Sequence, residues 1–422
     1  MVKPGTIFTG DNLPILRGMD SGSVDLIYLD PPFNSKRDYA APIGSKAAGA
    51  EFKDTWTLAD TDDAWWGEIA DKNPSLYKVI DAAGAAGGKS DKAYCIYMAM
   101  RLLEMRRVLK PLGSIYYHCD PTMSHAVKLV MDAIFGGDNF RNEIIWHYAS
   151  PGGRAKTHFA KKSDTILFYA NSGEVAQGKG FYPDDKALRA EISQTSMDMH
   201  YRHVDSDGRR YREVRSNGKT YRYYQDEGKA VDNVWGDVGI APSNTPLHRE
   251  YQGYPTQKPL ALLNRIIAAS SKEGDLVLDP FCGCATACVA AQYGKRGWIG
   301  IDISPKAYDL TLARFEKELG IFNPKIIHRS DIPERADRQK RSRDIKHILF
   351  GKQRGICNGC LYDFQFRHFH VDHIVARDVG GSDSDDNLQL LCGNCNSIKG
   401  TGTMEKLIAE LDRRGLRNKP RA

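Results

Sequence analysis

The chain has 422 residues, with 59 Lys and Arg against 53 Asp and Glu and a formal net charge of +6. At roughly 100–200 residues per domain, this length predicts two or three domains. Hydrophobic residues at 41% and charged residues at 27% exclude a disordered chain. No apolar run approaches the ~18 residues of a membrane helix, and the first residues contain no apolar signal segment. We therefore expect a cytoplasmic protein that has no membrane partner. Nine cysteines in a long chain that is not expected to be exported do not suggest a disulfide framework.

The first 170 residues alternate predicted strands and helices, which is typical of an α/β domain. The elements are a strand at Val24–Leu29, a helix over 93–110, a strand over 114–120, a helix near 122–135, and strands at Glu143–Tyr148 and Thr165–Tyr169. Residues 36–92 interrupt this pattern as a long insertion that is rich in Ala, Gly, Asp and Trp. Its function is left open, either as a cover over a bound substrate or cofactor or as a surface embellishment.

The pattern changes in residues 171–253 and changes back after them. Turn signals DSDG, SNGK and DEGK separate short segments rich in Arg and Tyr, and together they predict a β-meander. The later elements are a helix at Leu260–Ser271, a strand at Leu276–Asp279, a helix at Thr286–Tyr293, a strand at Trp298–Asp302 and a helix at Pro305–Leu319. A charged linker over 334–346, a compact unit over 347–405 with clustered Cys and His, and a basic tail over 406–422 complete the chain.

The segment DLVLDPFCGCATACVAA predicts a buried strand, a tight turn and a helix. In doubly wound sheets, nucleotides bind at such a turn, against small residues and the helix N-terminus. Asp302 ends the next strand, where a carboxylate can accept hydrogen bonds from ribose hydroxyls. The absence of GxGxxG disfavours a dinucleotide. An ordinary βαβ unit with a chance acidic residue is the alternative.

Asp30-Pro31-Pro32-Phe33 follows the first predicted strand, and its prolines force the chain to turn. The Asp30 carboxylate and the Pro31 carbonyl then lie at the carboxyl edge of the sheet. Two acceptors beside an aromatic ring suit a planar base that carries an NH₂ group. Each acceptor takes one N–H, and Phe33 stacks on the base. The nitrogen lone pair becomes available to attack a methyl sulfonium.

Four motifs together resemble the amino-methylating DNA methyltransferases of the β group. They are GDN at 10–12, DPPF at 30–33, TQKP at 256–259 and DPFCGCAT at 279–286. That group is circularly permuted, with the catalytic motif ahead of the cofactor motif, as in this chain. The resemblance covers about residues 5–320. It implies a doubly wound, Rossmann-like sheet with an inserted β-rich target-recognition region.

The resemblance also implies the cofactor and the roles of individual residues. S-adenosylmethionine would contact Asp279, Phe281 and Gly283, with Asp302 at its ribose, Thr256 and Lys258 at its methionine end and Asp11 at its adenine. Asp30, Pro31, Pro32 and Phe33 would be the catalytic residues. One departure is Ala285, where the family most often has glycine.

The substrate implied is double-stranded DNA, from which the target base is flipped out at a cost of a few kcal/mol. The Asp-Pro-Pro form favours the N6 amine of adenine, with N4 of cytosine as the alternative. NEIIWHY at 142–148 resembles a motif whose aromatic residues line the base pocket, although Trp146 and Tyr148 fit core packing equally well. The Arg- and Tyr-rich meander is in the usual target-recognition region, or else is a solvated sheet.

Two CxxC pairs in the C-terminal unit predict a structural zinc site. They are Cys357 with Cys360 and Cys392 with Cys395. Four thiolates are typical of a closed tetrahedral zinc site that supplies much of a small unit's stability.

Between the two pairs, HFHVDHIVARDVGGSDSDDNLQLLCGNCNSIKG resembles the HNH nuclease family over about residues 350–400. The resemblance implies a small zinc-stabilised ββα-metal domain. His373 fits the general base, and Asp372 and Asn396 fit oxygen ligands for Mg²⁺ or Mn²⁺. Asn387 resembles the motif's middle asparagine. Many members have a histidine where this chain has Asn396, and His370 is a further candidate ligand.

We interpret the chain as an adenine-specific DNA methyltransferase with its own HNH endonuclease, encoded by a bacterium or phage. The predicted segments are 1–170 (catalytic part), 171–253 (target recognition), 254–333 (S-adenosylmethionine binding), 334–346 (linker), 347–405 (nuclease) and 406–422 (tail). One rival is a methyltransferase whose HNH-like module only binds DNA or a partner. Another is a nuclease whose methyltransferase-like half mainly recognises sequence. A homodimer is left open.

Overall fold

The computed structural model describes residues 2–41, 51–148, 156–172, 181–182, 188–239, 250–251, 253–254, 257–320, 324–335 and 344–418. The chain forms two compact units, which are described separately below. The first unit comprises Met1–Asp54, Glu104–His125 and Phe135–Asp337, and the second comprises Thr55–Leu103, Ala126–Ile134 and Arg338–Ala422.

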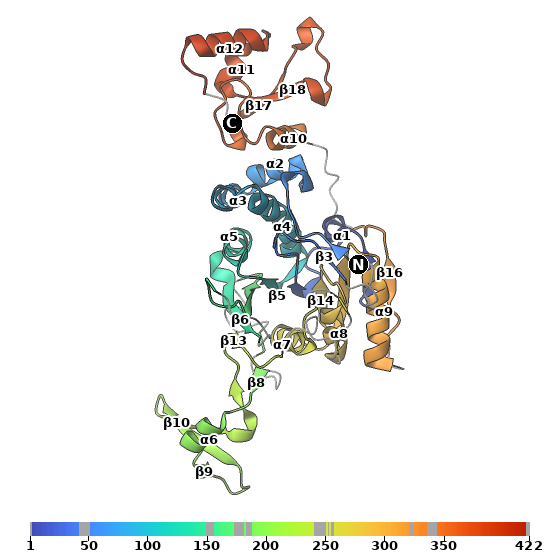
Figure 1. The fold of residues 1–422 in the computed structure, drawn as a ribbon, viewed down its shortest axis with the longest axis vertical. Helices are drawn as coiled ribbons and strands as arrows, with labels where there is room; N and C mark the ends of the chain where they lie inside the picture. The colour runs from blue at the N-terminus through green and yellow to red at the C-terminus, as the bar shows by residue number, and fades with distance from the viewer. Residues whose placement is uncertain are drawn as a thin grey trace. The chain divides into compact units, whose positions relative to one another are not determined.

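A nine-stranded sheet forms the centre of the first unit (Figure 1). Its order is β13 (Val234–Trp235), β6 (Phe140–His147), β7 (Ser163–Ala170), β5 (Leu109–Cys119), β2 (Val24–Leu29), β14 (Leu276–Asp279), β15 (Gly297–Asp302), β1 (Thr6–Thr9), β16 (Ile327–Arg329). Neighbouring strands pair in parallel except at β7, which runs opposite to both β5 and β6. The predicted doubly wound α/β sheet is therefore confirmed.

The central strands form because they are short apolar runs that the sheet buries on both faces. Helices of this unit include α1 (Asn12–Gly18), α7 (Leu260–Ser270), α8 (Thr286–Tyr293) and α9 (Lys306–Leu319). A buried core joins apolar residues of β2, β14 and β15 to apolar residues of α7 and α8. The predicted strands at Val24–Leu29 and Leu276–Asp279 and the helix at Thr286–Tyr293 have the predicted bounds.

The predicted β-meander is present as a separate antiparallel sheet of β9 (His203–Val204), β10 (Arg210–Ser216) and β11 (Lys219–Tyr224). Glycines at the turns of this region, such as Gly208 and Gly218, have positive φ and allow the tight reversals. Shorter elements of this unit are β3 (Tyr39–Ala40), β4 (Glu51–Phe52), β8 (Arg189–Ala190), α6 (Gln194–His200) and β12 (Lys229–Ala230).

The second unit combines helices from the insertion with the C-terminal part of the chain. It contains α2 (Asp63–Lys72), α3 (Pro74–Gly87), most of α4 (Lys89–Val108), most of α5 (Ser124–Phe135), α10 (Ile345–Lys352), β17 (Phe369–His373), β18 (Leu388–Cys392), α11 (Gly393–Lys399) and α12 (Met404–Arg413). Figure 1 shows α10 beside α2, where the two helices pack against each other. His347 of α10 contacts Asp71 of α2 at 3.0 Å, and Tyr77 of α3 packs on Phe350.

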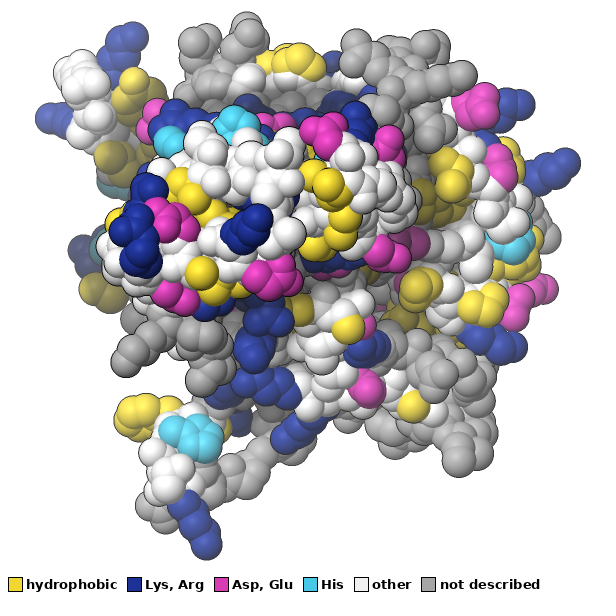
Figure 2. Space-filling view, turned by 90° about the horizontal axis from the view of Figure 1, so that it is seen from above, with side chains coloured by type: hydrophobic (Ala, Val, Ile, Leu, Met, Phe, Trp, Pro, Cys, Tyr) yellow, Lys and Arg dark blue, Asp and Glu magenta, His cyan; other side chains and the backbone are white. Residues whose placement is uncertain are grey.

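This grouping differs from the sequence expectation, which assigned all of 1–170 to the catalytic part. Residues 55–103 belong to the second unit together with the C-terminal part of the chain. Helices α2 and α10 pack closely there, because a glycine on each helix lets the two backbones approach each other. None of the described helices is both long and apolar enough to cross a membrane. Lys and Arg side chains lie among acidic and hydrophobic ones on the face shown in Figure 2.

Candidate active sites

Two turns that are far apart in the sequence meet at one edge of the large sheet. Asp30 directly follows β2, and Asp279 is the last residue of β14. β2 and β14 are parallel neighbours, with Leu278 opposite Ile27. Because both strands end at the same edge, the DPPF turn and the DPFCGC turn lie together, as the permuted order of the motifs requires.

The Asp30 carboxylate has one paired oxygen and one free oxygen. The Lys258 ammonium donates to Oδ2 of Asp30 at 2.5 Å, although the sequence resemblance assigned Lys258 to the cofactor. Oδ1 of Asp30 is buried and has no hydrogen-bond partner among the described residues. The Lys258 Nζ also lies 5.3 Å from the centre of the Phe33 ring. A buried acceptor without a donor is costly, so this oxygen is poised for an external N–H.

The polypeptide after DPPF is held by a residue that the sequence analysis did not identify. Asp54 accepts hydrogen bonds from the backbone N–H groups of Asn34, at 2.6 Å, and Ser35, at 3.0 Å. Asn34 has a left-handed φ of 59°, a conformation that asparagine tolerates better than most residues. Asp54 therefore fixes the exit of the catalytic turn.

The turn after β14 has the tight backbone predicted for a ligand-binding loop. Gly283 has a φ of +49°, and a Cβ at this position would stand 2.8 Å from the ring of Tyr254. Asp302 accepts hydrogen bonds from the backbone N–H groups of Gly283 and Ser304, each at 2.8 Å. Ala285 also has a left-handed φ of 60°, which explains why glycine is favoured at this position.

The remaining predicted cofactor residues that the structure describes are close to the same loop. Asp279 is buried, which raises its pKa, and its carboxylate accepts the N–H of Phe281 at 3.1 Å. Asp11 caps α1 by accepting the N–H of Leu13, and the adjacent Asn12 donates to the carbonyl of Pro280 at 2.7 Å. Thr256 lies outside the described residues.

A polar and aromatic cluster lies behind Phe33, and the sequence analysis did not identify two of its members, His118 and Asp164. His118 of β5 stacks on Phe33 with ring centres 6.0 Å apart, and its Nε2 contacts Asp164 of β7 at 3.1 Å. Tyr148 donates to the same carboxylate at 3.1 Å. Trp146 is 1% exposed and belongs to the core. The NEIIWHY motif had pointed to Trp146 and Tyr148, and the only sequence signal for His118 was a histidine near the end of an otherwise apolar strand.

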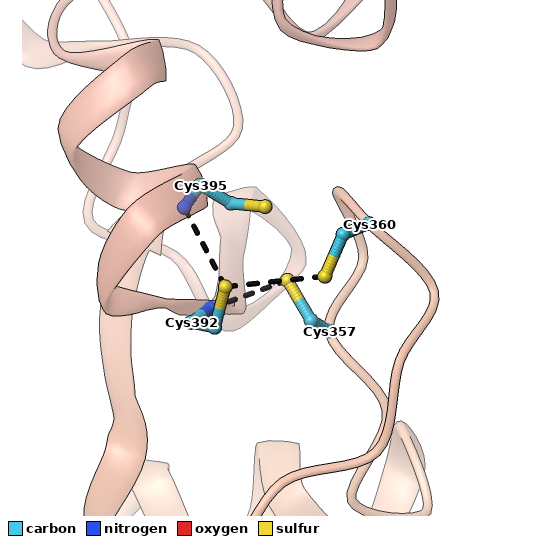
Figure 3. A group of neighbouring side chains, drawn as sticks. All are labelled: Cys357, Cys360, Cys392 and Cys395. Carbon is cyan, nitrogen blue, oxygen red and sulfur yellow. Dashed lines mark hydrogen bonds between the residues drawn. The ribbon is translucent and has the colours of Figure 1, made fainter. Parts of the chain in front are cut away.

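The four paired cysteines converge in the second unit (Figure 3). All are buried, and their Sγ atoms lie within 4.8 Å of one another, with Cys360 and Cys392 3.9 Å apart. Zinc–sulfur bonds of about 2.3 Å place tetrahedral sulfurs about 3.8 Å apart. A hydrogen bond from the Cys395 thiol lowers the pKa of Cys357. The donor set therefore fits the predicted zinc.

The predicted nuclease residues lie on β17 and on the helix that follows β18. The Asp372 carboxylate accepts hydrogen bonds from Lys399 of α11 and, at 2.9 Å, from Gln389 of β18. Asn396 lies on α11, one turn before Lys399. A carboxylate has about four acceptor positions, so these bonds leave room for an oxygen-binding metal.

His373 has an acidic partner, Asp383, that the sequence analysis did not identify. The Nε2 of His373 lies 2.8 Å from Oδ1 of Asp383, which also binds Arg377. Asn387 exchanges hydrogen bonds with the backbone of Val375, so it holds together the loop between β17 and β18. His370 is exposed and lies beside the start of α11, as a further ligand would.

Known proteins resemble this chain in both parts. The family model described as DNA methylase matches residues 24–313, and the model described as HNH endonuclease matches residues 357–402. The DNA adenine methyltransferase YhdJ of Escherichia coli is 27% identical over 311 residues, which cover 74% of this chain and 82% of that protein. The type II methyltransferase M.EcaI of Enterobacter cloacae is 28% identical over 354 residues, with coverages of 75% and 70%. The solved PvuII cytosine-N4-specific DNA methyltransferase is 15% identical, covers 74% of this chain and 89% of its own, and has a TM-score of 0.41.

Proposed function

Since this chain belongs to the DNA methylase family and carries a C-terminal HNH endonuclease domain, we propose that it methylates the N6 amine of adenine in double-stranded DNA and cleaves DNA with the same polypeptide. One observation carries the methylation proposal. The Oδ1 atom of Asp30 is buried and has no hydrogen-bond partner within the part of the chain that the structure describes. It lies at the carboxyl edge of β2, beside an aromatic ring and the DPFCGC turn.

The catalytic step assigned to Asp30 is hydrogen-bond acceptance from the target amine. The amine of adenine is a poor nucleophile because its lone pair is delocalised into the ring. When the free Asp30 oxygen accepts one N–H and the Pro31 carbonyl accepts the other, the nitrogen becomes more tetrahedral and its lone pair is localised. Lys258 holds the second Asp30 oxygen, so the acceptor is already oriented before the base arrives.

The cofactor that we propose is S-adenosylmethionine, which supplies an electrophilic methyl group when bound. Gly283 gives the loop its tight backbone, with a φ of +49° and so close a contact with Tyr254 that a Cβ would stand 2.8 Å from the ring, and the cofactor would lie against this loop. Asp302 and Asp279 offer carboxylates at the ends of adjacent strands, with Phe281 between them in the turn. Asp11 and Thr256 remain proposed contacts, and Lys258, whose ammonium binds Asp30, is proposed to reach the methionine end of the cofactor as well.

For the nuclease, we propose that His373 activates water and that Asp372, Asn396 and His370 hold Mg²⁺ or Mn²⁺. The metal would offset negative charge on the scissile phosphate. Asp383 orients the His373 ring, and Asn387 positions the loop that carries Asp383. Cys357, Cys360, Cys392 and Cys395 are proposed to bind a structural zinc.

The test of the methylation proposal is methyl transfer by an Asp30→Ala variant. Labelled methyl incorporation into DNA should be lost, while calorimetric binding of S-adenosylmethionine stays within about twofold. Asp132→Ala is the control because Asp132 pairs with Lys128 within α5 and belongs to the second unit, whereas Asp30 belongs to the first. Methyl transfer retained by Asp30→Ala would falsify the role assigned to Asp30.

The identity of the base is decided by digesting the labelled DNA to nucleosides. The DPPF motif and the adenine methyltransferase among the relatives support N6-methyladenine. Recovery of N4-methylcytosine alone would replace adenine with cytosine and leave the chemistry of Asp30 unchanged, because both bases present an exocyclic NH₂. A homodimer is a secondary proposal, checked by the mass of the protein in solution.

A further inference from the structure

Asp164 is the hub of a buried network on the methyl-acceptor side of the sheet. Its Oδ2 accepts the Nε2–H of His118, and its Oδ1 accepts the hydroxyl of Tyr148, each at 3.1 Å. The three residues come from three neighbouring strands or their ends, β5, β7 and the residue after β6. One carboxylate therefore joins two rings that the sequence separates widely.

The network also holds His118 through its second ring nitrogen. The Nδ1 of His118 lies 2.9 Å from the hydroxyl oxygen of Tyr28. Tyr28 lies in β2, two residues before Asp30. The imidazole is thus held at both nitrogens, fully buried, with its face on Phe33.

The rings around the network form a continuous aromatic wall. His118 contacts Phe33 in a stacked geometry and Trp146 edge-on, with centres 6.0 Å and 5.7 Å apart. Trp146 in turn lies 4.9 Å from Tyr148. Asp164 binds the two polar rings of this wall, so a change at Asp164 removes a hydrogen-bond partner from His118 and from Tyr148 at once.

We propose that Asp164 is a positioning residue for methyl transfer, which sets the orientation of Phe33 through His118 and of Tyr148 directly. The proposal rests on the function proposed above, since Phe33 matters only if a base stacks on it. Asp164 does not touch the reacting atoms. Its effect is on the surface that orients the base toward the free oxygen of Asp30.

The cost of the arrangement supports a role beyond packing. A buried carboxylate is expensive, and an apolar pair of similar volume is often as stable or more stable. Burial raises the pKa of Asp164, but the hydrogen bonds from His118 and Tyr148 and the charge of Lys258 outweigh this effect and leave the pKa lowered. Asp164 is mostly buried, with its side chain 13% exposed, and an ionised carboxylate bonded through both oxygens beside a reactive turn is typical of a site that needs fixed geometry.

The experiment compares wild type with Asp164→Asn and Tyr148→Phe. We would measure kcat, KM for DNA, binding of S-adenosylmethionine and thermal unfolding, with plasmid DNA from methylation-deficient cells as substrate. Both variants should bind S-adenosylmethionine as wild type does. Asp164→Asn should lower kcat by about ten- to a hundredfold, the range expected for a misplacement near 1 Å. Tyr148→Phe should lower it less, because His118 keeps its partner.

Tyr293→Phe is the matched control. It removes a tyrosine hydroxyl that binds Glu318, and neither residue belongs to the Asp164 network. It should leave kcat unchanged. The inference is overturned if Asp164→Asn keeps the wild-type kcat, or if its activity falls only in proportion to the fraction that binds S-adenosylmethionine. If wild type methylates no DNA at all, the proposed function fails first. Wild-type methylation with normal Asp164→Asn kinetics removes the positioning role alone.

Discussion

Gly67 of α2 lies so close to the backbone of His347 in α10 that a Cβ at position 67 would collide with the His347 carbonyl. A second glycine at this crossing, Gly351, would likewise collide with the carbonyl of Asp63. The two helices therefore touch through their backbones. The insertion after the catalytic turn thus serves in part as a platform for the C-terminal unit, a use that its composition did not suggest.

We expect Gly67→Ala to destabilise the second unit by about 1–3 kcal/mol, the usual cost of overpacking. In an exposed helix the same change would be stabilising, by up to about 1 kcal/mol, because alanine has the higher helix propensity. A loss of stability therefore reports the helix crossing itself. Hydrogen exchange of α10, together with thermal unfolding, measures the effect.

Gly236→Ala is the control, since a Cβ there would meet only an ordinary contact, 3.6 Å from His147. It should leave both measurements unchanged. If Gly67→Ala proved as stable as wild type, with α10 equally protected, α10 would not be docked on α2.

Local patterns predicted the parts of the fold that are written in contiguous residues. The strand before DPPF, the strand–turn–helix of DPFCGCAT and the two CxxC pairs each combine a backbone requirement with a chemical one within a few positions. The partners that the sequence analysis missed come from distant segments. Asp164 is recognisable only once β7 is known to pair with β5, and Gly67 only once α10 is known to lie on α2.

The departure at Ala285 gives a second prediction. Ala285→Gly should change the free energy of unfolding by less than about 1 kcal/mol, although it deletes a fully buried methyl group. Relief of the left-handed conformation is worth about 1–2 kcal/mol, which offsets about 0.8 kcal/mol of lost burial and the greater freedom of unfolded glycine. Chemical denaturation measures the change.

Ala287→Gly is the matched comparison, because Ala287 is equally buried but lies within α8. It should destabilise by about 1–2 kcal/mol, from lost helix propensity and lost burial. Equal losses at the two positions would contradict the strain assigned to Ala285.

The zinc and the nuclease metal should be separable. We expect about one tightly bound zinc per purified chain, because four convergent thiolates form a closed site. DNA cleavage should still require added Mg²⁺ or Mn²⁺. Elemental analysis and cleavage with and without each metal provide the measurements. Protein without zinc that keeps a folded C-terminal unit would refute the zinc site.

Removal of zinc by a strong chelator should unfold the C-terminal part while methyl transfer persists, since the four cysteines and Asp30 belong to different units. Cys119, a buried cysteine outside the cluster, offers a control: Cys119→Ala should leave the zinc content unchanged.

The last prediction concerns cleavage. His373→Ala should eliminate nicking and leave methylation intact, because the two sites share no residue. One HNH domain has one base, His373, and so addresses one scissile phosphate at a time. One chain should therefore make one nick, and double-strand cleavage should require two chains. The test is the digestion of a supercoiled plasmid with one methylation site over a range of protein concentrations. Nicked plasmid should appear before linear plasmid.

Asp383→Asn refines the same test. Asp383 lies 2.8 Å from the Nε2 of His373, so the variant should lower the nicking rate by about tenfold without abolishing it. Linear product without a nicked intermediate, formed at a rate first order in protein, would exclude one nick per chain. A His373→Ala protein that still nicked DNA would show that the HNH domain is only a binding module and that the cleavage arises elsewhere.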